Sequence, residues 1–166
     1  MPVDQMMGKF DDHADHIREQ YKGLQGIEAR ARSLQSYVAP WDTAENFLKR
    51  EAYLLISNFL ETEGGRNAIK KIIKGEKKIP RAPLFSDNPF YWGLLAIDPQ
   101  QDVYNKAKIS LYAPLLKYAY DHGVSPANLI GFLFQVGRPA DVRRKFNAKQ
   151  CEVDFKRVRE QSRMER

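Results

Sequence analysis

The sequence has few of the features that mark secreted or membrane-spanning proteins. Cys151 is the only cysteine among 166 residues, which excludes an internal disulfide and a secreted scaffold held together by disulfides. No apolar run approaches the roughly 18 residues that a membrane span needs. Residues 1–10 lack the basic and apolar regions of a signal peptide. We therefore expect a cytoplasmic protein without a membrane span.

Catalytic signatures are also missing. There is no glycine-rich phosphate loop and no nucleophile elbow, and Cys151 has no histidine near it in the sequence. His13 and His16 lie among three aspartates and can share a helix face. No other His or Cys lies at ligand spacing, however, so an acidic, solvated helix is the favoured interpretation. We expect a non-enzymatic protein with no cofactor and no metal.

The composition is that of a folded domain. Hydrophobic residues make up 43% of the chain, aromatic residues 11% and charged residues 29%. A chain of this length buries roughly 70% of the surface that its unfolded form exposes. There is no internal repeat and no convincing strand alternation. We predict a single all-α domain over 1–166, a bundle or orthogonal array of about seven to nine helices. Residues 1–38 would form acidic N-terminal helices, 43–147 the core and 148–166 a basic C-terminal helix that frays.

Apolar residues recur at helical spacing along most of the chain. We expect short helices at 66–74 and from Asn88-Pro89, and further helices at 4–25, 27–38, 43–62, 100–121, 126–136, 140–147 and about 149–163. Gly23 and Gly26 separate the first two of these. Asp42 has the capping-box spacing to Glu45, and Pro114 should kink the helix that contains it.

The positive charge is concentrated in two segments. The net charge is +6, but residues 1–65 carry seven basic and eleven acidic side chains. Residues 66–83 carry seven basic side chains against one acidic, and residues 138–166 carry ten against five. This asymmetry creates a directional field, which bears on the partners of the protein rather than on its fold.

The first basic segment is the strongest functional signal. Its cations are Arg66, Lys70, Lys71, Lys74, Lys77, Lys78 and Arg81. They could neutralise DNA or RNA phosphates and release condensed counterions, and the nearby rings of Phe85, Phe90, Tyr91 and Trp92 could stack on unpaired bases. Arg143, Arg144 and Lys145 would extend this footprint. We therefore expect a protein that binds nucleic acid or a nucleoprotein complex.

Other interpretations of the basic segment stay open. It could be a solvated helix face, or it could bind an acidic protein or a membrane surface. The acidic N-terminal helix could also fold over the basic patch and partly mask its charge.

Residues 119–129 have the spacing of a helix-turn-helix turn. A recognition helix needs polar side chains that reach base edges. The segment after Ser125 is apolar nearly all round, which favours a buried helical hairpin.

The second functional hypothesis is a protein–protein adaptor or inhibitor, for example an accessory factor of a plasmid, phage or secretion system. Phe90, Tyr91 and Trp92 form the densest aromatic cluster of the sequence. Such residues dominate interface hot spots, so this cluster would be the partner-binding anchor. Burial of these rings would count against the hypothesis.

Overall fold

Helices make up the regular structure of the computed structural model, which describes residues 1–39 and 42–152. Within these ranges there are seven α-helices, one 3₁₀ turn and no strand, so the predicted all-α class is confirmed. None of the helices in the described part of the chain is long and apolar enough to cross a membrane.

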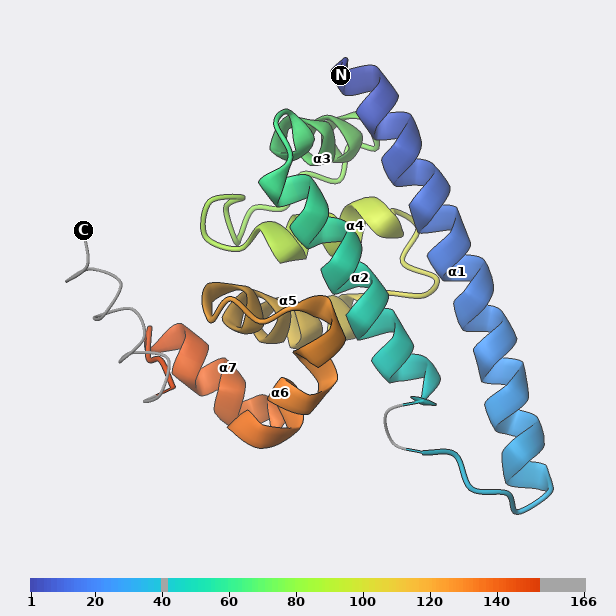
Figure 1. The fold of residues 1–166 in the computed structure, drawn as a ribbon. Helices are drawn as coiled ribbons and strands as arrows, with labels where there is room; N and C mark the ends of the chain where they lie inside the picture. The colour runs from blue at the N-terminus through green and yellow to red at the C-terminus, as the bar shows by residue number, and fades with distance from the viewer. Residues whose placement is uncertain (40–41, 153–166) are drawn as a thin grey trace.

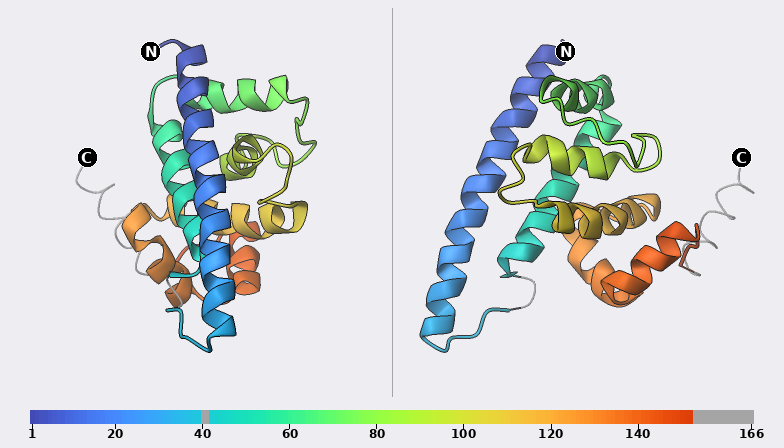
Figure 2. Two further views of the ribbon diagram at one scale, coloured as in Figure 1. Left: turned by 90° about the vertical axis from the view of Figure 1, so that its right-hand side faces the viewer. Right: turned by 180° about the vertical axis from the view of Figure 1, so that it is seen from behind.

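Three helices stack one above another in the centre of the molecule (Figure 1). They are α3 (Gly65–Gly75), α4 (Pro89–Ile97) and α5 (Lys106–Asp121). Helix α2 (Ala44–Glu61) crosses all three, and α1 (Val3–Ser33) runs along one side of the stack. Beyond α5 lie the 3₁₀ turn η2 (Pro126–Asn128), α6 (Leu129–Val136) and α7 (Pro139–Asn147), at the end opposite to α3 (Figure 2).

Helix α1 is one continuous helix, whereas the sequence predicted two, at 4–25 and 27–38. Gly23 and Gly26 lie inside it. A glycine lowers helix stability by about 1 kcal/mol relative to alanine but does not forbid a helix. Tertiary packing of the N-terminal two-thirds stabilises α1. The buried stripe consists of Met6, Phe10, Ala14, Ile17 and Tyr21.

Helix α2 supplies the centre of the core. Leu48, Ala52 and Ile56 are fully buried. The N-cap is Thr43 rather than Asp42, because the Thr43 side chain accepts a hydrogen bond from the backbone N–H of Asn46 at 3.2 Å. The predicted capping box is therefore wrong, and Glu45 has a different role.

The carboxylate of Glu45 joins α1, α2 and α5. It accepts hydrogen bonds from Tyr21 Oη at 2.8 Å, from Lys108 Nζ at 2.8 Å and from Tyr112 Oη. Burial by itself raises the pKa of Glu45, but these three hydrogen bonds outweigh it and lower the pKa. Burial lowers the pKa of Lys108, and its bonds to Glu45 and Tyr21 outweigh that and raise it. The cluster fixes α1 against the stack.

Helix α5 begins six residues later than the predicted start at residue 100. The carboxylate of Asp98 accepts hydrogen bonds from the backbone N–H groups of Val103 at 2.6 Å and Tyr104 at 2.8 Å, which hold the preceding segment as a loop. Asn105 then caps the helix through the N–H of Lys108 at 2.9 Å. The helix continues through Pro114.

The C-terminal part of the chain differs from the prediction in two places. The helix expected at 126–136 is divided into η2 and α6, whose Leu129, Ile130, Phe132 and Val136 are buried. Residues 149–152 are not helical. The rest of the helix expected at 149–163 lies outside the described residues.

Candidate nucleic-acid interface

Helix α3 is amphipathic and lies at the end of the stack, so one of its faces meets solvent (Figure 1). Ala68, Ile69, Ile72 and Ile73 are buried, which places the intervening positions outside. The exposed positions carry Arg66, Lys70, Lys71 and Lys74. Burial of the isoleucine face therefore orients these four cations towards solvent.

Two glycines allow α3 to follow α2 at once. Gly64 has φ +80°, a left-handed conformation that side chains rarely adopt. A Cβ on Gly65 would lie 1.9 Å from the carbonyl oxygen of Phe59, so only glycine fits there. Arg66 then donates from Nε to the carbonyl of Leu60 at 3.2 Å, which ties the start of the basic helix to the end of α2.

The loop after α3 carries three more exposed cations. Lys77, Lys78 and Arg81 are exposed. Trp92 of α4 donates from Nε1 to the carbonyl of Pro83 at 3.0 Å, and its ring packs edge-on against Phe85 with centroids 5.6 Å apart. The loop is thereby held against α4.

The same aromatic rings support the helix. Phe85 is buried, and Lys70 Nζ lies 4.7 Å from the centroid of its ring, a cation–π contact. Two of the rings that the sequence suggested for base stacking, Phe85 and Trp92, thus hold the basic loop in place.

The three rings of the proposed partner anchor have different surroundings. Phe90 is fully buried and stacks on Tyr53, so it offers no surface to a partner or a base. Trp92 is half-buried, and its indole N–H donates to the carbonyl of Pro83. Tyr91 is half-buried and lines a pocket.

None of the seven cations of 66–81 forms an ion pair within residues 1–39 and 42–152. An unpaired, exposed cation keeps its full charge available to a ligand, and an anion can bind it without displacing a carboxylate. We define the basic surface as these seven side chains.

The acidic half of α1 borders the basic surface on one side. Asp11, Asp15 and Lys71 line a shared cleft of about 450 Å³. Asp15 is paired with Arg18 rather than with Lys71. Burial, and next the charge of Asp15, raise the pKa of Asp11. The acidic helix therefore adjoins the surface at Lys71, whereas Lys70 and Lys74 do not line this cleft.

In the second basic segment, the three cations Arg143, Arg144 and Lys145 of α7 have different surroundings. Lys145 donates to the carboxylate of Glu152 at 2.7 Å and to the carbonyl of Val136 at 2.9 Å, so it serves the fold. Arg144 lies 3.5 Å from Asp141. Arg143 is exposed and lines the pocket that also contains Tyr91.

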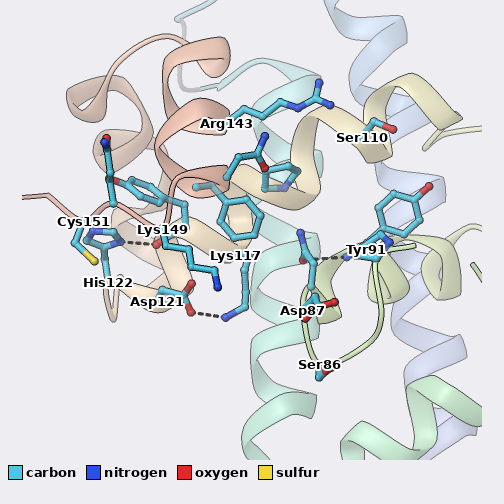
Figure 3. A pocket seen from close by; sticks show the side chains of 17 residues that line it. Ser86, Asp87, Tyr91, Ser110, Lys117, Asp121, His122, Arg143, Lys149 and Cys151 are labelled. Atoms are coloured by element: carbon cyan, nitrogen blue, oxygen red, sulfur yellow. Dashed lines mark hydrogen bonds and ion pairs between the residues drawn. The ribbon is translucent and has the colours of Figure 1, made fainter. Parts of the chain in front are cut away.

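This pocket, of about 710 Å³, lies between the end of the basic loop and helices α5 and α7. Figure 3 shows Arg143 entering it from α7, and the ion pair of Lys117 with Asp121 facing it from α5. Lys149 also lines it. The sequence reasoning missed Lys117, because a single lysine in an apolar helix carries no pattern that points to a pocket.

Cys151 and His122 line the same pocket (Figure 3), although no histidine is near Cys151 in the sequence. His122 is buried, and its Nδ1 lies 2.6 Å from the carbonyl of Tyr118. Its Nε2 accepts the backbone N–H of Glu152 at 3.0 Å. Both nitrogens are engaged by the backbone, so the imidazole has no free nitrogen to act as a base for the thiol.

Glu152 fastens the end of the described chain to α5 and α7. Besides Lys145, it accepts a hydrogen bond from Tyr118 Oη at 2.7 Å. Burial raises the pKa of Glu152, but the hydrogen bonds from Lys145 and Tyr118 outweigh it and lower the pKa. The described residues contain no group of three or more His, Cys, Asp or Glu side chains arranged to hold a metal ion.

Comparisons with protein-family models, with curated proteins and with solved structures found no match.

Proposed function

We propose that the protein binds nucleic acid through its phosphate backbone, with the basic surface of α3 and the following loop as the contact. The observation that carries the proposal is the exposure of all seven cations with no carboxylate partner in the described residues. Each phosphate contact releases condensed counterions, so such a surface favours a polyanion.

The anchoring of the loop supports the proposal. A flexible loop loses conformational entropy when it binds, and that loss opposes affinity. Here Trp92 and Phe85 hold the loop before any ligand arrives. The cations of the helix and of the loop are therefore arranged before binding, which favours contact with a regular row of phosphates. A face that only meets solvent would not need this anchoring.

The test is the salt dependence of binding to fluorescently labelled single- and double-stranded oligonucleotides, followed by anisotropy between about 50 and about 200 mM salt. The wild type should bind at low salt and release steeply as salt increases. The variant K70E/K71E/K74E should lose this binding. For duplex DNA, replacing three phosphate contacts should flatten the log–log salt slope by roughly 2 to 3.

A matched control carries the same change of charge elsewhere. Arg30, Arg32 and Lys106 are exposed on α1 and α5, so R30E/R32E/K106E alters the net charge equally. This control should retain most of the affinity. Equal losses in both variants, or no binding of the wild type at low salt, would refute the proposal. A pull-down from the native host, with and without nuclease, separates nucleic acid from an acidic protein partner.

A further inference from the structure

An apolar groove lies away from the basic surface, where α2, α5 and α6 meet the turn before α7. Its volume is about 370 Å³, within the range of small-ligand sites. Leu115, Ile130, Leu133 and Phe134 supply its apolar lining. Phe134 is 64% exposed, unusual for a phenylalanine beside a core, so its ring is available to a ligand.

The charged groups of the groove are both cationic. Lys49 and Arg138 line it, and no carboxylate lines it in the described part of the chain. Arg138 extends into solvent and lies 3.5 Å from Asp141. The groove therefore combines an apolar floor with a positive edge.

Lys49 is the more informative of the two cations. It is half-buried, and its Nζ lies 5.1 Å from the ring centroid of Tyr112 and 3.5 Å from Asn46 Oδ1. No carboxylate oxygen of the described residues lies within 4 Å of it. Burial lowers the pKa of Lys49, and the charge of Glu45 offsets this only in part. An incoming anion would restore the stabilisation that this ammonium group has lost.

We propose that this groove binds a small soluble amphiphile, an alkyl chain that ends in a carboxylate, with the chain on Leu133 and Phe134 and the carboxylate on Lys49. A neutral amphiphile would gain the apolar contacts but not the ion pair. A cationic one would bring its charge against Lys49 and Arg138.

The probe is sodium decanoate, with sodium octanoate, decyltrimethylammonium and decyl maltoside as comparisons, each below its micelle concentration. Calorimetry should give affinities that increase by up to about fourfold per methylene between octanoate and decanoate. Decanoate should bind at least about tenfold more tightly than the cationic amphiphile. Amide chemical shifts in the wild type should change at residues 130–138, which requires no variant.

Two variants test the role of the ammonium group. Lys49→Met keeps the length of the side chain and should weaken decanoate binding about tenfold, while decyl maltoside binding stays within about twofold. Lys106→Met removes an exposed lysine at the start of α5 and should change neither. The α3 variant K70E/K71E/K74E should bind decanoate like the wild type, so this site and the nucleic-acid surface can fail independently.

Four results would overturn the proposal. They are the absence of decanoate binding, equal affinity for Lys49→Met, shift changes confined to another region, and binding to anionic phospholipid vesicles in place of soluble decanoate.

Discussion

The two basic segments look alike in sequence and differ in the folded protein. The segment 66–81 lies at one end of the helical stack, and all seven of its cations are exposed. In α7, at the other end, Lys145 is engaged by Glu152 and Arg144 by Asp141. A count of charges therefore does not predict their availability. The position of the carboxylates in space decides it.

Charge reversal in each segment tests this difference in availability most directly. We expect K70E/K74E to weaken oligonucleotide binding by about a hundredfold, about 2.7 kcal/mol, because each substitution removes a phosphate contact and adds repulsion. R143E/R144E should weaken it by less than about threefold, since Arg144 already faces Asp141 and Arg143 lies on α7, at the other end of the stack from α3. Anisotropy at one fixed salt concentration measures both. Equal losses would show that the footprint extends to α7, as the sequence predicted.

The effects of substitutions on stability should follow the opposite order, with the larger loss in α7 and the smaller in α3. Lys145→Met removes the hydrogen bonds to Glu152 and Val136, and we expect a loss of about 1–3 kcal/mol in the free energy of unfolding. Lys74→Met alters an exposed side chain and should change it by less than about 0.5 kcal/mol. Urea denaturation followed by circular dichroism measures both values. If Lys74→Met were the more destabilising, our assignment of the two lysines would be wrong.

Local signals explain which parts of the fold could be predicted. The helices expected at 43–62 and 66–74 match α2 and α3 to within one residue at each end, since the apolar period and the Gly64-Gly65 stop are encoded nearby. The start of α5 could not be found this way. Asp98 delays it by binding two backbone N–H groups five and six residues later, a contact that exists only in the folded loop.

The candidate site shows the same division. Helical periodicity is enough to place Lys70 and Lys74 on the outer face of α3, opposite the buried isoleucines. No pattern could show that Trp92 would bind the loop carbonyl of Pro83, or that Lys145 would face Glu152. These contacts join residues from different elements, and tertiary packing sets them.

Anchoring of the loop distinguishes the first basic segment further. Trp92→Phe removes the hydrogen bond to Pro83 while keeping an aromatic ring, and we expect a loss of about 1 kcal/mol in stability. Because Lys77, Lys78 and Arg81 lie in the loop, oligonucleotide affinity should also decrease, by about threefold. Hydrogen exchange of the loop amides should accelerate in parallel. Unchanged affinity with accelerated exchange would show that loop order does not contribute to binding.

The smallest effect concerns pH. The pKa of Glu152 in the folded protein lies below its ordinary value of 4.5, so its ionised form stabilises the fold. This contribution is complete above the unfolded-state pKa and is lost as the pH falls through the lower folded-state pKa. We therefore expect Glu152→Gln to be less stable than the wild type at neutral pH, by less than about 1 kcal/mol. This difference should vanish in acid. Denaturation curves between neutral and strongly acidic pH measure it.

This last variant also tests the contrast between the two segments. Glutamine keeps the backbone N–H that bonds His122 Nε2, so that contact cancels in the difference between wild type and variant. Lys74→Met should show no such pH dependence, because Lys74 has no carboxylate partner in the described residues. A difference for Glu152→Gln that persists unchanged in acid would mean that packing of its side chain, rather than its charge, holds Lys145 in the fold.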